Sequence, residues 1–290
     1  MTNNYGNPCA ILADPLGNAW PFASAVYEDL RKRSDRFELN EVNVKRFRDR
    51  EIKVKIRDNV RRKNCFFIHD SSLAPADWFT ELAFVNEALK NSSANEIVDV
   101  LPYMRFSRQD RKDESRVAVN ARVLSDVVSL YADRVLTIDT HFVQLPGFYR
   151  IPFDNLYSSR LLFEYLREKH SEILEHAVVM SPDAGGTSRA KAFASRLGIR
   201  DIVIGYKHRK KEGEISEFRV VGDVEGENVL IIDDIVDSGN TLIEATKAIR
   251  AAGARKVYVY CTHGLFSEGC EKVCSAVDQM FVTNSIPPPV

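Results

Sequence analysis

The chain has no excess of charge of either sign, and it has no long apolar run. Its 290 residues carry 40 Lys and Arg against 41 Asp and Glu, which gives a formal net charge of −1. This balance removes any general attraction for polyanions, so we expect neither a nucleic acid nor a membrane as partner. No apolar stretch approaches the roughly 20 residues that cross a bilayer, and residues 1–8 do not resemble a secretory signal. The sequence therefore predicts a soluble, cytoplasmic protein.

Cysteine is scarce and irregularly spaced. The chain has an odd number of cysteines, five, at Cys9, Cys65, Cys261, Cys270 and Cys274. In a chain of this length, such a set argues against a disulfide framework. Cys270 and Cys274 have no second pair and no nearby His with which to complete a zinc site, so we interpret them as buried thiols.

Short β-branched or aromatic runs alternate with longer segments of helical periodicity along the whole chain. This alternation is typical of βαβ units and predicts an α/β fold with mostly parallel sheets flanked by helices. At roughly 150 residues per domain the length allows two domains, which we assign to residues 1–154 and 155–290. The predicted strands are 10–13, 37–44, 65–69, 97–101, 135–138, 177–180, 201–206, 229–232, 257–261 and 280–282, and the predicted helices are 77–90, 119–131, 159–169, 188–197 and 242–252.

The strongest local signal follows the apolar run at 229–232. In open parallel sheets, ligands bind beyond the carboxyl ends of the strands, where N–H groups of the next helix attract phosphate. Gly239 allows close backbone approach, and neighbouring carboxylates at a strand end point to opposite sides, so one of Asp233 and Asp234 can bind vicinal sugar hydroxyls. The alternative is an ordinary strand-to-helix turn with Asp and Ser caps. The residues of this sugar-phosphate hypothesis are Asp233, Asp234, Asp237, Ser238, Gly239, Asn240 and Thr241.

This segment resembles the phosphoribosyl pyrophosphate (PRPP) signature of type I phosphoribosyltransferase folds. That fold serves phosphoribosyltransferases, which consume PRPP, and ribose-phosphate pyrophosphokinases, which make it. Six further segments are similar to pyrophosphokinase motifs and follow in the same order: 46–51, 106–112, 139–141, 151–157, 181–186 and 262–264. The resemblance to the ribose-phosphate pyrophosphokinase family implies two tandem type I phosphoribosyltransferase-like domains. The N-terminal domain would carry ATP-binding loops, and the C-terminal domain the ribose 5-phosphate and catalytic loops.

A cationic segment at 108–112 follows the predicted strand at 97–101. Taken alone, it is as typical of a solvated surface as of an anion site. The resemblance implies that it binds ATP, while Phe47 stacks on adenine from a loop that reaches a neighbouring subunit. A homodimer is then the minimum active unit, with a hexamer as an alternative assembly. The residues implied for ATP are Phe47, Asp49, Glu51, Arg108, Gln109, Asp110 and His141.

The resemblance also implies Mg²⁺, which neutralises ATP oxygens, and a loop whose backbone amides meet the diphosphate. Lys207 and Arg209 match the family's catalytic Lys and Arg, which stabilise charge on the transferring group. Read alone, this basic segment is equally typical of an exposed turn. The implied metal residues are Asp139, His141 and Asp183, and the implied diphosphate loop is Asp183, Ala184, Gly185 and Gly186.

The implied reaction transfers the β,γ-diphosphoryl group of Mg·ATP to the C1 hydroxyl of ribose 5-phosphate and yields PRPP and AMP. Two alternatives stay open: a phosphoribosyltransferase that consumes PRPP, and a non-catalytic regulatory homologue that binds active subunits. Asn240 departs from the family pattern, since it stands where the phosphate loop usually has a second Gly. Asn tolerates the left-handed backbone conformation, so we expect the loop to be preserved.

Overall fold

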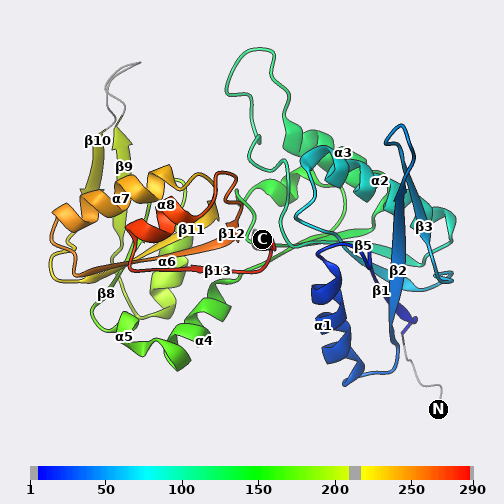
Figure 1. The fold of residues 1–290 in the computed structure, drawn as a ribbon, viewed down its shortest axis with the longest axis horizontal. Coiled ribbons are helices and arrows are strands. Elements are labelled where there is room, and N and C mark those ends of the chain that lie inside the picture. Colours follow the sequence, from blue (N-terminus) through cyan, green and yellow to red (C-terminus); the bar gives the residue numbers. More distant parts are fainter. Residues whose placement is uncertain (1–5, 209–216, 288–290) are drawn as a thin grey trace. The chain divides into compact units, whose positions relative to one another are not determined.

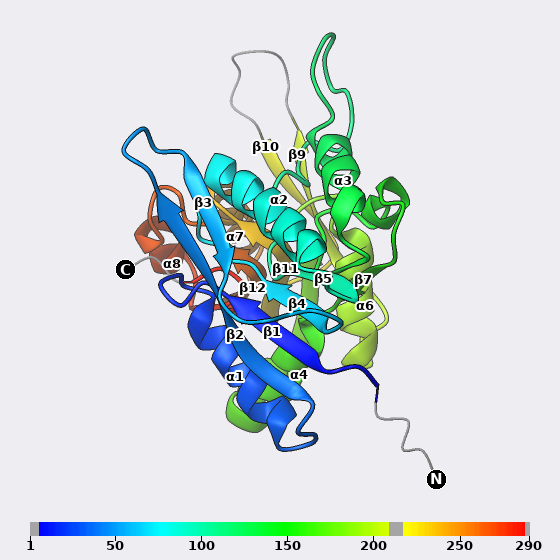
Figure 2. The same ribbon diagram turned by 90° about the vertical axis from the view of Figure 1, so that its right-hand side faces the viewer.

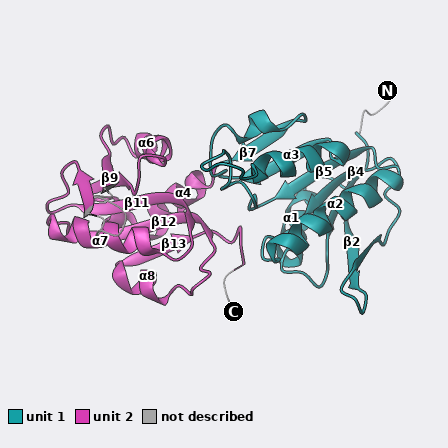
Figure 3. Ribbon diagram, turned by 90° about the horizontal axis from the view of Figure 1, so that it is seen from above, with its two compact units in different colours: residues 1–156 teal, residues 157–290 magenta. Residues whose placement is uncertain are grey.

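The structure, a computed structural model, describes residues 6–208 and 217–287 (Figure 1). The chain divides into two compact units, residues 1–156 and 157–290 (Figure 3). Each unit is a mostly parallel sheet with helices on its faces, as the sequence predicted. Among the described residues, no helix combines the length and the apolar character needed to cross a membrane.

The first unit is built on a seven-stranded sheet with the order β3-β2-β1-β4-β5-β6-β7. All neighbouring strands run parallel except β2 and β3, which form an antiparallel hairpin. The predicted domain boundary after residue 154 falls inside β7. The elements are β1 (Cys9–Ala13), α1 (Trp20–Arg31), β2 (Phe37–Arg46), β3 (Ile52–Ile56), β4 (Asn64–Ile68), α2 (Pro75–Asn91), β5 (Glu96–Leu101), α3 (Asn120–Tyr131), β6 (Arg134–Ile138), the 3₁₀ helix η1 (Leu145–Phe148) and β7 (Phe153–Leu156).

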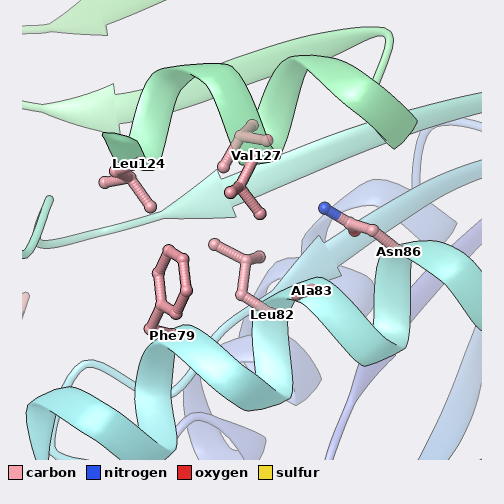
Figure 4. A pocket seen from close by; sticks show the side chains of 7 residues that line it. Phe79, Leu82, Ala83, Asn86, Leu124 and Val127 are labelled. Carbon is pink, nitrogen blue, oxygen red and sulfur yellow. The ribbon is translucent and has the colours of Figure 1, made fainter. Parts of the chain in front are cut away.

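The central strand β1 is apolar on both faces because helices cover both. Ala10 and Leu12 belong to the core formed with α2 and α3, whereas Ile11 and Ala13 belong to the smaller core under α1. This division follows from the two-residue period of a strand. Figure 2 shows α1 on one side of the sheet and α2 on the other. A hollow between α2 and α3 is lined by Phe79, Leu82, Ala83, Asn86, Leu124, Val127 and Val128 (Figure 4) and has no room for a water-sized molecule.

The second unit is built on a six-stranded sheet with the order β10-β9-β8-β11-β12-β13. Only the β9–β10 pair is antiparallel. This order repeats that of the first six strands of unit 1, so the two units share one topology although their sequences show no close repeat. The elements are α4 (Ser159–Lys169), α5 (Ser171–Leu174), β8 (Ala177–Ser181), α6 (Thr187–Arg196), β9 (Val203–His208), β10 (Glu217–Val221), β11 (Asn228–Val236), α7 (Asn240–Ala251), β12 (Lys256–Gly264), α8 (Glu271–Ala276) and β13 (Gln279–Val282).

Strand β11 runs through the middle of the second core. Leu230 and Ile232 pack on the face covered by α4 and α6, and Val229 and Ile231 pack on the face covered by α7 and α8. The alternation carries on to the acidic pair at the end of the apolar run. Asp234 therefore falls on the α6 side of the sheet.

The cysteines differ in part from the expectation. All five are free thiols, and Cys9, Cys65 and Cys261 are buried in strands. Cys270 is only half-buried and Cys274 is exposed, so the interpretation of this pair as buried thiols is wrong. Both lie on the short α8 or at its N-cap, and its first buried side chain is Val273.

Candidate functional site

The second unit has a topological switch point between β8 and β11. These strands are parallel neighbours, with β9 and β10 on one side and β12 and β13 on the other. Connections after the two strands leave to opposite faces of the sheet, and in open α/β sheets the crevice that binds ligands lies at the carboxyl ends of two such strands. The loop at 182–186 and the loop at 237–239 follow these two strands. Two of the predicted sites thus meet at one edge of one sheet.

The 237–239 loop begins α7 in a conformation that requires glycine. Gly239 has φ +72° and is the N-cap of α7. A Cβ atom at this position would lie 2.7 Å from the Cβ of Val273, well inside contact distance. Asn240 is exposed and is the first residue of α7. Its φ is not positive, so Asn240 does not adopt the left-handed conformation that the sequence allowed for it. In this loop Gly239 adopts that conformation instead.

Asp237 is held by the segment that follows β12. Its Oδ1 accepts a hydrogen bond from the Ser267 N–H at 3.4 Å and another from the Ser267 hydroxyl. Ser267 was not predicted from the sequence, because no local pattern around it signals a contact 30 residues away. These bonds tie the loop to the segment that leads into α8.

Asp233 and Asp234 share a cation that the sequence analysis also missed. The Nη1 atom of Arg189 lies 2.9 Å from Oδ1 of Asp234 and 3.6 Å from Oδ1 of Asp233. All three side chains are largely shielded, at 20% exposed for Arg189 and Asp233 and 6% for Asp234. One signal for Arg189 was available, because a cation in the first turn of a helix opposes the helix dipole and so indicates a tertiary anionic partner.

Asp233 is shifted toward protonation. Burial and the neighbouring Asp234 carboxyl raise the pKa of Asp233 well above its usual range, and Arg189 opposes this rise. Cys261, opposite Asp233 on β12, also has a pKa well above its usual value, chiefly because of burial and then because of the two carboxyls. Two full negative charges at this spacing in a shielded site repel each other strongly.

The 182–186 loop is a tight turn. Oδ1 of Asp183 accepts a hydrogen bond from the Gly186 N–H at 2.9 Å, and the Ser181 hydroxyl donates to the Asp183 carbonyl at 2.6 Å. A Cβ on Gly186 would lie 2.8 Å from Oγ of Ser181, so the turn needs glycine there. Ala184 and Gly185 are exposed. An exposed turn of this kind at the start of α6 can present backbone N–H groups to an anion.

In the first unit, three predicted ATP residues form the turn of the β2–β3 hairpin, which projects from its sheet (Figure 1). Phe47 N–H donates to the Glu51 carbonyl at 2.8 Å, and the Glu51 N–H donates to Oδ1 of Asp49 at 3.1 Å. Phe47 is 55% exposed. An aromatic face held in solvent by a rigid turn is available for stacking.

The remaining ATP residues follow β5 and β6. Gln109 is held by its own loop, since its Nε2 donates to the Arg111 carbonyl at 3.1 Å and to Asp113 at 2.9 Å. Asp110 accepts from Arg111 at 3.0 Å, and the Arg108 side chain is exposed. The 108–112 segment is thus a charged surface turn whose side chains are partly engaged with one another.

Asp139 and His141 follow β6 directly. Asp139 is only 5% exposed and its N–H donates to the Leu156 carbonyl at 2.8 Å, which extends the pairing of β6 with β7. Its φ of +43° is uncommon for a residue other than glycine. His141 is exposed. Uncommon backbone conformations at a strand end cluster at functional sites.

Asp139 in the first unit and Asp183 in the second unit each offer a carboxylate that suits a hard cation such as Mg²⁺, which protein sites hold by one or two carboxylates together with substrate phosphates. Among the described residues, no three His, Cys, Asp or Glu side chains group so as to hold a metal by themselves. Each carboxylate, taken by itself, fits an ion that arrives with a nucleotide. Of the predicted catalytic pair, Lys207 lies in β9, but its side chain is not among those that the structure describes. Arg209 lies outside the described residues.

These loops on two sheets of this topology define the type I phosphoribosyltransferase-like class of PRPP-handling folds. Residues 17–130 match the N-terminal domain of ribose phosphate pyrophosphokinase, and residues 214–290 match the phosphoribosyl synthetase-associated domain. The chain is 40% identical over 252 residues to a ribose-phosphate pyrophosphokinase of Campylobacter jejuni, covering 86% of this chain and 80% of that one. It is 40% identical over 276 residues to the Ralstonia nicotianae enzyme of the same name, covering 93% and 84%.

A solved structure agrees with these relatives. The phosphoribosylpyrophosphate synthetase of Mycobacterium smegmatis superposes with a TM-score of 0.82 at 29% identity, over 96% of this chain and 90% of that one. The chain belongs to the ribose-phosphate pyrophosphokinase family, as its motifs predicted.

Proposed function

We propose that this protein transfers the β,γ-diphosphoryl group of Mg·ATP to the C1 hydroxyl of ribose 5-phosphate, forming PRPP and releasing AMP. The observation that carries the proposal is the crevice at the carboxyl ends of β8 and β11. It combines a glycine-dependent phosphate loop with a shielded pair of carboxylates on a single sheet edge. Membership of the pyrophosphokinase family points to synthesis rather than consumption of PRPP.

The ribose 5-phosphate would bind in this crevice. The N–H groups at the start of α7, with the hydroxyls of Ser238 and Thr241, would hold the 5-phosphate. Asp233 would accept hydrogen bonds from the ribose hydroxyls, Asp234 would support it from the interior, and Asn240 would contribute its N–H group at the first position of α7. The 182–186 turn, at the neighbouring strand end, would hold the diphosphate as it reaches the sugar.

ATP would use the first unit. Phe47 would stack on adenine, with Asp49 and Glu51 beside it, while Arg108, Gln109 and Asp110 would position the phosphates with His141. Mg²⁺, where Asp139, His141 and Asp183 contribute, would neutralise phosphate oxygens when bound. We assign the hairpin to a neighbouring subunit's site, so a homodimer is the minimum active unit and a hexamer is the alternative.

The chemistry would be an in-line displacement. The C1 oxygen attacks the β-phosphorus, the bond from that phosphorus to the bridging oxygen of the α-phosphate breaks, and AMP leaves with the bridging oxygen. The hydroxyl proton passes to solvent. Lys207 and Arg209 would stabilise the charge on the migrating group, and positioning accounts for the rest of the rate.

The test is to incubate the purified protein with Mg·ATP and ribose 5-phosphate and to quantify AMP and PRPP. We expect the two products in equal amounts. PRPP consumption with a nucleobase and no AMP formation would instead favour the phosphoribosyltransferase. Inactivity together with stable association with an active homologue would favour the regulatory protein. The cytoplasmic location predicted from the sequence is part of the same proposal, because ATP is the diphosphoryl donor.

The role of Lys207 has its own test. Because one charge-stabilising donor typically accounts for about 10²–10³ in rate, we expect Lys207→Ala to lower kcat by that order while the fold is retained. Lys247→Ala, an exposed lysine of α7, is the matched control. Circular dichroism checks the fold of both variants, and unchanged turnover of Lys207→Ala would remove this residue from the mechanism.

A further inference from the structure

Arg189 occupies a place that none of the proposed substrate contacts explains. It begins on the first turn of α6, directly after the 182–186 turn, and its guanidinium reaches across to β11. One nitrogen, Nη1, lies within 4 Å of an oxygen of each carboxylate of the acidic pair. Arg189 thus links α6 to β11, the strand that leads into the 237–239 loop.

The two carboxylates are not equivalent toward this cation. Asp234 makes the shorter contact, 2.9 Å, and is 4% exposed as a residue, on the side of the sheet that α6 covers. Asp233 is more distant at 3.6 Å, is more exposed, and has one oxygen that accepts the Asp234 N–H at 2.9 Å. Asp234 is therefore fixed in the interior, and Asp233 is the acid that can face a ligand.

We propose that Arg189 is the positioning residue of the ribose 5-phosphate site, which pins Asp234 and keeps Asp233 able to ionise when the ribose hydroxyls bind. This inference rests on the proposed function for the identity of the ligand. Arg189 itself would not touch the sugar. Its removal would take from Asp233 the cation that opposes its protonation, and the acid would hold its proton more tightly.

In this proposal, Asp233 releases its proton when ribose 5-phosphate binds. A carboxylate accepts hydrogen bonds from two sugar hydroxyls only when it is ionised. Since the pKa of Asp233 without ligand is raised, the affinity for ribose 5-phosphate increases as the pH rises through that pKa and levels off above it. The titratable and charged groups acting on Asp233 are Asp234 on its own strand, Arg189 on α6 and Cys261 on β12. Loss of Arg189 moves the affinity increase to higher pH.

The experiment measures KM for ribose 5-phosphate and kcat from pH 5.5 to 9.5 in the full-length wild type, Arg189→Gln and Arg189→Lys. At pH values below the pKa of Asp233, a rise of this pKa by one unit lowers the affinity for ribose 5-phosphate about tenfold. We therefore expect Arg189→Gln to raise KM about tenfold or more at low pH, with a smaller gap at high pH and a lesser effect on kcat. Arg189→Lys restores the charge and should move the profile back. Lys191→Gln, an exposed cation of the same helix, should leave the profile unchanged.

A second readout needs no turnover. Carbon-13 NMR of the Asp carboxyls without ligand, with Asp233→Asn for assignment, follows the titration of Asp233 directly. We expect its midpoint to be higher in Arg189→Gln than in wild type. A midpoint and a KM profile that do not move, with only a loss of thermal stability, would show a merely structural arginine and overturn the proposal. Absence of ribose 5-phosphate binding in the wild type would contradict the proposed function instead, while the ligand-free titration would still decide the role of Arg189. The phosphate of the sugar titrates near pH 6 for all variants alike, so differences between variants report on the protein.

Discussion

Gly239 decides whether the 237–239 loop, the proposed phosphate loop, can form. Its left-handed backbone alone costs a residue with a Cβ about 1–2 kcal/mol, and the Val273 side chain leaves no room for that Cβ. We therefore expect Gly239→Ala to raise KM for ribose 5-phosphate strongly and to lower the thermal stability.

The chain offers a matched control for this change. Gly226 has nearly the same φ, +74°, but no atom lies within 4 Å of its added Cβ. Gly226→Ala therefore pays the backbone cost without the collision. Steady-state kinetics and thermal unfolding of both variants separate the two contributions, and equal effects on KM would argue against a specific requirement in the loop.

Individual residues also show where sequence reasoning stops. The motif at 233–241 identified the loop, because glycine and acidic residues at a strand end carry a local meaning. Arg189 and Ser267 were missed, since each acts through a partner 30 or more residues away. Such contacts depend on how the sheet brings strand ends together, which no local spacing encodes.

At the scale of elements, the buried strands were predictable, whereas of the four edge strands of the two described sheets only β13 was predicted. The central strands carry continuous apolar runs because both faces are covered, and the sequence located them within a few residues. Strands β3 and β10 lie at sheet edges, and the charged alternation of β3 in Ile52–Ile56 hides its strand character. Helix α1 was missed since Pro21 interrupts the pattern, although proline is well suited to the first helical turn, where it lies. Strand β7 was missed as well, because it has only four residues.

Strand β5 carries a carboxyl with no cation beside it. Asp99 is fully buried, its Oδ2 accepts a hydrogen bond from Asn86 at 2.8 Å, and burial raises its pKa to about 7. In the unfolded chain the pKa would be near 4. The folded state therefore binds the proton more tightly, and its stability is full below pH 4 and is lost as the pH rises toward and through 7.

Asp99→Asn cannot ionise. We therefore expect its free energy of unfolding, relative to that of wild type, to increase by a few kcal/mol from pH 5 to pH 8. Urea unfolding of the two proteins at both pH values measures the difference. The pKa of Glu81 is also raised to about 7, but it is present in both proteins and cancels. Asp35→Asn, an exposed acid of the same unit, is the control. A stability difference independent of pH would mean that Asp99 does not carry the proton.

At the scale of the whole molecule, the proposed active site requires two copies of the chain. The hairpin with Phe47 would complete the site of a neighbouring subunit, whereas Lys207 would act within the site of its own. Two separately inactive variants, Phe47→Ala and Lys207→Ala, should then complement each other. In an equal mixture that exchanges subunits, half of the dimers are mixed and each has one intact site, which gives about a quarter of wild-type activity.

The measurement is PRPP formation after the two variants are mixed, unfolded and refolded together. Each variant refolded alone is the control for residual activity. No recovery in the mixture, with dimers present by light scattering, would show that Phe47 and Lys207 serve the same subunit's site.

The two units share one strand order, and this order gives their loops matching places. Strands β2 and β3 occupy the same places in the first sheet as β9 and β10 in the second. The turn that carries Phe47 and the sequence between β9 and β10 therefore stand at corresponding positions of one topology. In the proposed function these positions would serve adenine and the transferring diphosphoryl group, so the same place in the two sheets would be used for the two ends of ATP.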